Sequence, residues 1–319
     1  MKFVPREPLA YVAVAAVEPV VQPANGSLQS GGPPRVIGIY ASHDAAALYL
    51  DLFLDPTAKR EIDWSRDRYV IALNTCDAPC GAEQLPVPGG IRLAEGANFV
   101  VELQGPPASR LLVADNYDPW QEVAVAPTGS REFRVVRDMT IALASDARFE
   151  HEIVETNVLR FARDGTRFPR INADRSFLRY GNFEVGAQDY SSLGQWYYDP
   201  PRARLRLRLS WGLLLALDPS QGLVFWGTDN KGIPAGKVSH SIRLVLLSYA
   251  APDDKEAGTV AQIMAASDSG NVLIKGWGIP WPTWGSVKYQ PTFKKSYHEL
   301  SKAFPELTGY ATGGGDPQD

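Results

Sequence analysis

The side chains of this chain best suited to bind a ligand are aromatic, and they gather in four loop-like stretches with acidic or amide neighbours. These stretches are NYDPW (Asn116–Trp120), QWYYDPP (Gln195–Pro201), LVFWGTDN (Leu223–Asn230) and WGIPWPTWGS (Trp277–Ser286). Indole and phenol rings stack on the apolar C–H face of a sugar ring, while Asp, Asn and Gln bond the sugar hydroxyls. The pattern therefore favours a carbohydrate-binding surface.

The candidate ligand-binding residues are the rings of these stretches and one carboxylate. They are Trp281, Trp284, Trp277, Trp226, Trp196, Tyr198, Asp229, Trp120 and Tyr117. The alternative for each ring is burial in a core, where aromatic side chains contribute much of the apolar area. Trp211, inside the run WGLLLAL, is expected in the core. Of the last stretch, one or two rings are expected to close one end of the core, and Trp281, between two prolines, is expected to face a groove.

Motifs for catalysis are missing from the sequence. It has no GxSxG, no HExxH and no phosphate-binding glycine loop, and its four histidines are scattered (His43, His151, His240 and His298). With 36 acidic residues, some carboxylates always lie near one another, so their spacing carries no signal for glycoside hydrolysis. Met139 and Met264 with these histidines make a poor set of haem ligands. We therefore expect a protein that is not an enzyme.

Metal sites have little support in the sequence. The two cysteines, Cys76 and Cys80, are too few for a zinc site, and both a short loop disulfide and two free thiols remain open for them. The segments DNYDP (residues 115–119) and GTDNKG (227–232) could supply oxygen ligands to a structural Ca²⁺, although neither has the spacing of a defined calcium loop. We expect no other cofactor.

Composition limits the partners and the location. The formal net charge of −4 argues against nucleic-acid or membrane-surface binding through a global basic field. The apolar runs are too short to span a bilayer, and Pro5–Pro8 interrupts any signal-peptide core. We expect an extracytoplasmic or cell-surface domain of a longer protein, with a cytoplasmic protein as the alternative.

Alternating apolar and polar residues predict an all-β chain. Strands are predicted at residues 35–41, 47–55, 68–75, 99–105, 110–115, 132–138, 202–210 and 240–249. Turn signals between them indicate one mainly antiparallel, jelly-roll-like β-sandwich over residues 35–310, after a leader at 1–34 and before a tail at 311–319. Residues 211–219 fit a single helical turn, and Lys294–Leu307 fits a short C-terminal amphipathic helix.

The strand at residues 202–210 (RARLRLRLS) carries four arginines on one face and three leucines with one alanine on the other. Two interpretations of the arginine row are open. It is either a solvated sheet face or a surface that binds an anionic ligand.

Several stretches resemble a known family. SHDAAALYLDLFLD followed by DRYVIALNT resembles the opening of family 9 carbohydrate-binding modules and related DOMON-like β-sandwiches. GIRLAEGANFVVEL, LRYGNFEVGAQDYSSLGQWYYD, LSWGLLLALDPS and WPTWGSVKYQPTFKKSYHELSKAF resemble a C-terminal sandwich domain of large bacterial proteins that carry a glycoside-hydrolase-like barrel upstream. The resemblance covers residues 35–307. Asn74 departs from it, because the family pattern has the Asp of an Asp-Thr pair there.

Two functions of different classes follow. The first is a non-catalytic accessory module that binds a polysaccharide or oligosaccharide by aromatic stacking. The second is a structural or interaction domain that packs on an upstream catalytic domain or a partner protein, with the aromatic rings buried at that interface.

Overall fold

The computed structural model describes residues 12–14, 32–58, 60–119, 140–157, 160–169, 171–228, 233–251, 259–264, 267–268 and 273–284. The chain divides into two compact units, Met1–Thr283 and Trp284–Asp319, and the sheets below belong to the first. Strands make up 53% of the structure. The helical elements of the described ranges are two 3₁₀ turns, η1 (Pro200–Arg202) and η2 (Pro219–Gln221). The all-β prediction is confirmed.

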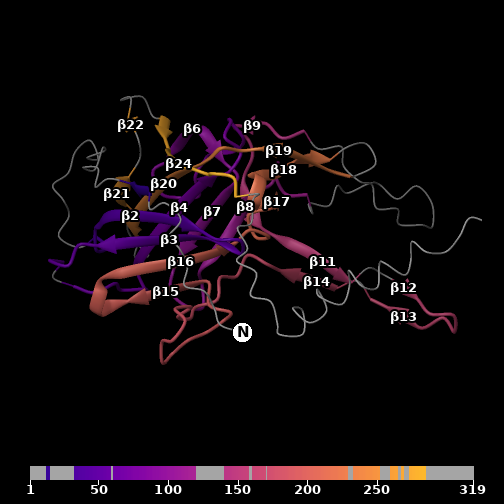
Figure 1. The fold of residues 1–319 in the computed structure, drawn as a ribbon, viewed down its shortest axis with the longest axis horizontal. Coiled ribbons are helices and arrows are strands. Elements are labelled where there is room, and N and C mark those ends of the chain that lie inside the picture. Colours follow the sequence, from indigo (N-terminus) through magenta and orange to yellow (C-terminus); the bar gives the residue numbers. More distant parts are fainter. Residues whose placement is uncertain are drawn as a thin grey trace, which may run out of the picture. The chain divides into compact units, whose positions relative to one another are not determined.

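Sheet A contains five antiparallel strands in the order β1–β2–β3–β16–β15 (Figure 1). Their bounds are β1 (Val12–Val14), β2 (Val36–His43), β3 (Ala47–Leu54), β16 (Arg204–Ser210) and β15 (Trp196–Asp199). Leu205, Leu207 and Leu209 of β16 lie opposite three leucines of β3, and all are buried. The alternation in the sequence therefore places one face of this sheet in a core.

Sheet B is buried on both faces. Its order is β10 (Phe149–His151), β8 (Arg110–Ala114), β7 (Phe99–Leu103), β4 (Asp67–Asn74), β20 (Ser241–Ala250) and β21 (Thr259–Met264), and β24 (Trp277–Pro280) also pairs with β20. Nearly every residue of β4 is buried, which explains its continuous apolar run YVIAL.

Side chains on one face of sheet B meet sheet A. The ring of Trp64 lies 6.3 Å from that of Tyr69 on β4 and 5.2 Å from that of Trp196 on β15. Gln262 of β21 exchanges two hydrogen bonds, of 2.9 and 2.7 Å, with the backbone of Val36 on β2. These contacts join the two sheets as a sandwich.

The other face of sheet B packs against a third layer that sequence patterns did not predict. Sheet C runs β22 (Ser267–Asp268), β23 (Leu273–Lys275), β6 (Arg92–Ala97), β5 (Gly81–Gln84) and β9 (Leu143–Ala144), with parallel pairing at β23–β6 and β5–β9. Val70, Ala72 and Val245 of sheet B form a buried cluster with Leu93 and Ile274 of sheet C. The fold therefore has two cores.

Three small ribbons complete the described structure. The first has three strands, β17 (Ala216–Asp218), β18 (Leu223–Thr228) and β19 (Pro234–Val238). The second pairs β11 (Ile153–Asn157) with β14 (Ile171–Asp174), and the third pairs β12 (Arg160–Phe161) with β13 (Arg167–Phe168). Seven predicted strands coincide with β2, β3, β4, β7, β8, β16 and β20. The predicted strand at 132–138 and helix at 294–307 lie outside the described residues, as does the expected domain end at 310. At 211–219 the chain forms a hydrogen-bonded turn, closed by Leu214 N to Ser210 O, and then β17.

Candidate functional site

The structure contradicts the expectation that Trp281 faces a groove. Its side chain is only 3% exposed, and its ring stacks on that of Trp211 with centroids 4.7 Å apart and planes 14° from parallel. Both indole N–H groups donate to backbone carbonyls of partly buried residues, Trp281 to Pro219 O and Trp211 to Asp44 O. The two rings therefore close one end of the core, as expected for Trp211, because the flanking prolines do not prevent burial.

Two further candidates, Trp196 and Tyr117, are also core residues rather than ligand contacts. Both are fully buried. Trp196 donates its indole N–H to Leu178 O at 3.3 Å, and the Tyr117 hydroxyl donates to Phe225 O at 2.8 Å. Each polar atom has a hydrogen-bond partner inside the protein. Because both side chains are fully buried, neither ring offers a face to a ligand.

The remaining candidates are dispersed. Tyr198, Trp226 and Trp277 are partly exposed on β15, β18 and β24, and among the described residues no ring contact joins any two of them. The Lys237 ammonium covers the Trp226 ring at 4.0 Å. Trp284 is partly exposed. Trp120 and Asp229 lie outside the described residues.

The arginine row of β16 fits neither of its two interpretations completely. Arg204 and Arg206 have side chains only 19% and 17% exposed, so the row is not a fully solvated face. Arg206 donates to Asp51 at 3.0 Å and to Glu184 at 2.8 Å. Because the charges of Arg204 and Arg206 are already paired with carboxylates, the middle of this row is a poor receptor for an anionic ligand.

A group of tyrosines lies beside this row, on β15 and the segment before it; two of them are exposed and Tyr197 is partly buried. We define the tyrosine cluster as Tyr180, Tyr190 and Tyr197. The rings of Tyr180 and Tyr197 are 5.7 Å apart with planes tilted by 42°. Tyr180 and Tyr190 are 41% and 45% exposed. Two adjacent, accessible rings at a sheet edge form a surface on which sugar rings can stack.

An oriented carboxylate adjoins these rings. Burial is the main cause that raises the pKa of Tyr197 and of Tyr180, and the charge of Asp189 raises both further, which places this carboxylate near both phenols. The buried Asn182 donates to Asp189 Oδ1 at 2.9 Å. The carboxylate is therefore held in position, and its oxygens are hydrogen-bond acceptors for hydroxyl groups.

The segment that carries the tyrosine cluster is fixed by close backbone contacts. Gly181 and Gly194 touch so closely that a Cβ on Gly194 would lie 2.1 Å from Gly181 O. Gly181 N donates to Trp196 O, and Ser191 N donates to Asn182 O. The buried Trp196 anchors the end of the segment, and Tyr180 packs edge-on against its ring at 4.7 Å. The rings are thus preformed.

The sequence held part of the signal for this site. The stretch LRYGNFEVGAQDYSSLGQWYYD carries the whole cluster. The number of tyrosines and the neighbouring Asp and Asn could have selected this stretch, but the predicted ligand contacts include only Trp196 and Tyr198 from it and omit Tyr180, Tyr190 and Tyr197. Alternation along β15 would have placed Tyr197 opposite in direction to the buried Trp196.

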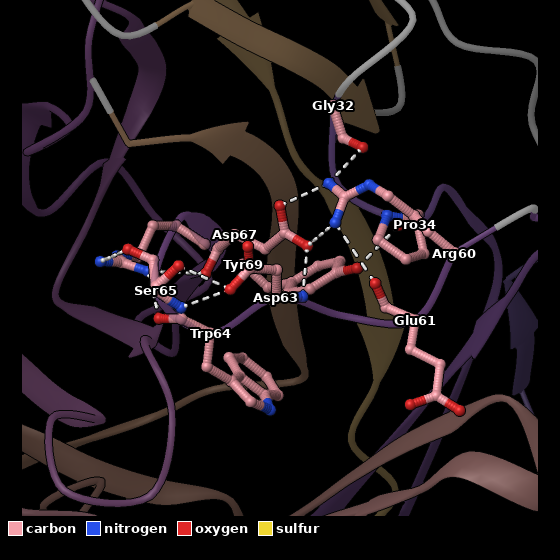
Figure 2. A network of polar contacts seen from close by, with 10 residues as sticks. Gly32, Pro34, Arg60, Glu61, Asp63, Trp64, Ser65, Asp67 and Tyr69 are labelled. Carbon is pink, nitrogen blue, oxygen red and sulfur yellow. Dashed lines mark hydrogen bonds and ion pairs between the residues drawn. The ribbon is translucent and has the colours of Figure 1, made fainter. Parts of the chain in front are cut away.

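Three buried polar side chains lie elsewhere in the fold: Asp67, Asn74 and Glu152. Arg60 donates two hydrogen bonds, of 2.7 and 2.8 Å, to the fully buried Asp67 (Figure 2). Arg60 also donates to Gly32 O, so it connects the start of β4 to the segment before β2. Cys76 and Cys80 form a disulfide, and the buried Asn74 holds their loop. Asn74 Nδ2 donates to Ala78 O and Glu95 O, and its Oδ1 accepts from Cys76 N.

Glu152 is the one of these groups without hydrogen bonds to its side chain. It is 2% exposed, and neither carboxyl oxygen has a donor within bonding distance. Burial raises its pKa to about 7, while Arg175, 3.6 Å away, opposes that rise. The residue lies between β10 and β11, at the base of a ribbon rather than in a cleft.

No protein-family model, curated protein or solved structure matches the chain. Among the described residues, no group of three or more His, Cys, Asp or Glu could hold a metal, and no helix there is long and apolar enough to cross a membrane. Any function therefore rests on the geometry described above.

Proposed function

We propose that this protein is a non-catalytic carbohydrate-binding module and that the tyrosine cluster is its sugar-binding site. The observation that carries the proposal is the preformed pair of Tyr180 and Tyr197, 5.7 Å apart, beside the oriented carboxylate of Asp189. The rings would stack on the C–H face of a sugar, and Asp189 would accept from its hydroxyls. The ligand would be a polysaccharide or oligosaccharide.

The exposure of the site sets the expected affinity. Its polar atoms compete with water, so dissociation constants of roughly micromolar to millimolar are expected. The rigid segment limits the ordering cost, since the rings need not be fixed on binding. The disulfide between Cys76 and Cys80 supports an extracytoplasmic location for the module.

An interaction domain is the second candidate function. Val185 and Leu193 are 80% and 60% exposed in the segment that carries the tyrosine cluster. Large exposed apolar side chains of this kind favour contact with a protein, such as an upstream catalytic domain of the same chain. Sugar binding is preferred because the same segment also presents Asp189 and three tyrosines.

Affinity electrophoresis in gels that contain neutral soluble glycans tests the proposal. Wild type should be retarded by at least one glycan class, and Tyr197→Ala and Tyr180→Ala should lose that retardation. Tyr40→Ala is the matched control, because Tyr40 is 40% exposed but lies on β2, outside the cluster. Folded wild type that no glycan retards would favour the interaction domain instead.

A further inference from the structure

A second candidate site lies on the β12–β13 ribbon. We call residues 160–168 the arginine–phenylalanine tip; its sequence is RFARDGTRF, and Figure 1 labels its two strands. Two short-range hydrogen bonds define the turn between the strands. Gly165 N donates to Ala162 O at 3.0 Å with Gly165 in the left-handed region at φ +85°, and Thr166 N donates to Asp164 Oδ1 at 2.9 Å. The sequence Asp-Gly suits such a hairpin turn.

The tip carries three guanidinium groups for which the described residues supply no partner. Within the part of the chain that the structure describes, Arg160, Arg163 and Arg167 have no hydrogen-bond or ion-pair partner, and all three are exposed. On sheet A, by contrast, Arg204 and Arg206 are held by Asp51 and Glu184. In a chain with a net charge of −4, these three cations remain available to an anion.

Each face of the tip pairs one arginine with one phenylalanine. Arg160 lies directly opposite Phe168, and Phe161 lies directly opposite Arg167. Directly opposed residues share a face, with Cβ atoms about 4.5–5.5 Å apart. Phe161 and Phe168 are 66% and 49% exposed, so neither face is covered. The ribbon therefore offers an open ring and an adjacent cation on both sides.

We propose that the arginine–phenylalanine tip binds an anionic polysaccharide, whose sugar rings carry carboxylate or sulfate groups. In such a polymer the anion is bonded to the ring that stacks, so ring and anion reach one phenylalanine–arginine pair together. In a nucleotide, the ribose separates the base from the phosphate. The net acidity of the chain also disfavours nucleic acid. This site is separate from the tyrosine cluster, so either can fail alone.

Affinity electrophoresis with charged and neutral glycans tests the inference. The gels contain polygalacturonate, dextran sulfate or neutral dextran. The test variant is Arg160→Gln/Arg163→Gln/Arg167→Gln. The control is Arg35→Gln/Arg148→Gln/Arg202→Gln, which has the same net charge but changes exposed arginines outside the tip. Circular dichroism and the melting temperature check that every variant is folded.

The expected result is retardation of wild type by at least one anionic glycan and not by dextran. The tip variant should bind about tenfold more weakly or worse, because it loses three exposed charge contacts, and the control should match wild type within about twofold. Binding should also weaken as salt increases. Phe161→Ala/Phe168→Ala should weaken binding without changing the charge, which separates stacking from simple attraction.

Three outcomes would overturn the inference. The first is that wild type binds no anionic glycan, and the second is that the control triple variant loses as much binding as the tip variant. The third is that an oligothymidylate displaces the glycan at equal or lower concentration. The last result would assign the tip to single-stranded nucleic acid. Tyr180→Ala and Tyr197→Ala should leave binding of anionic glycans unchanged. A failure of neutral-glycan binding would therefore count against the tyrosine cluster and not against the arginine–phenylalanine tip.

Discussion

Glu152 is a buried carboxyl group in an environment that disfavours its charged form. Its carboxyl group is buried without hydrogen bonds, and its pKa is raised to about 7 from an ordinary value of 4.5. A raised pKa in the folded state means that the folded protein holds the proton more tightly than the unfolded chain. The stability from this group is therefore complete below about pH 4.5 and is lost as the pH rises through about 7.

Glu152→Gln should remove that loss, because the amide resembles the protonated acid. We expect the variant to gain stability relative to wild type as the pH rises from about 5 to 8. Urea unfolding at several pH values measures this difference. Glu61→Gln, which changes an exposed glutamate, is the control. A Glu152→Gln effect independent of pH would contradict the assignment.

Asn74 needs both its amide donor and its carbonyl acceptor. Its N–H groups meet two backbone carbonyls, at 3.0 and 2.9 Å, and its oxygen accepts from Cys76 N. Asn74→Asp should therefore cost about 3 kcal/mol at pH 7.5, since a buried carboxylate would face carbonyl oxygens. The cost should shrink at pH 5, where the acid can be protonated. Equal stability of variant and wild type at pH 7.5 would contradict this role.

Burial of single aromatic residues could not be predicted from the sequence. Trp281 and Trp277 share one Pro- and Gly-rich stretch, yet only Trp281 finds a stacking partner, and that partner, Trp211, is 70 positions away. Local neighbours do not encode such a contact. Tyr197 differs, because alternation along β15 contains the information that its side chain points away from that of Trp196, although the prediction of ligand contacts did not use it.

At the scale of elements, strands with strict alternation were predictable and their connections were not. The alternation of β16 predicted its buried face and its end at Ser210, but the strand begins at Arg204 rather than Arg202, because Pro200–Arg202 form η1. The segment from 178 to 195 has no period, because glycine contacts and Asn182 define its shape rather than repeated apolar positions. Tyr180, Asp189 and Tyr190 of the candidate site lie there, so these members emerged only from the structure.

The Arg60–Asp67 pair is the polar contact that fixes the start of β4. Arg60→Ala should cost about 2–4 kcal/mol, because it leaves the buried Asp67 carboxylate without its cation; the 38% exposure of Arg60 keeps the cost below that of a fully buried pair. Chemical unfolding measures the change.

The matched control is Arg92→Ala. Arg92 pairs with Glu83 on the surface and is 44% exposed, so its loss should cost less than about 1 kcal/mol. Adding Asp67→Asn to Arg60→Ala should restore part of the stability. Equal effects of the two arginine substitutions would show that the buried carboxylate does not need its partner.

At the scale of the whole molecule, the three layers of the first unit explain why the sequence of β4 is apolar at nearly every position. Sheet B packs against a core on each face, so β4 does not alternate between apolar and polar residues as a strand of a two-layer sandwich does. Sheet C consists of short strands of two to six residues, and its parallel pairings join distant segments. Patterns within single strands could not show it.

The proposed ligand site lies on a fixed segment at the edge of sheet A, which separates it from the cores. Substitutions in the tyrosine cluster should reduce the proposed sugar binding while leaving the cores intact, since Tyr180 and Tyr190 are 41% and 45% exposed. Substitutions at buried Trp281 or Trp196 should instead lower stability by about 3–5 kcal/mol. Binding and stability should therefore separate by position.

Protection of tyrosines from nitration by a bound glycan, mapped by peptide mass spectrometry, tests the central claim most directly. We predict that a glycan selected by electrophoresis will slow nitration of Tyr180 and Tyr197, while Tyr40, equally exposed on β2, reacts at its unliganded rate. Protection of Tyr40 with Tyr180 and Tyr197 still reactive would contradict the account, because the sugar would then bind elsewhere.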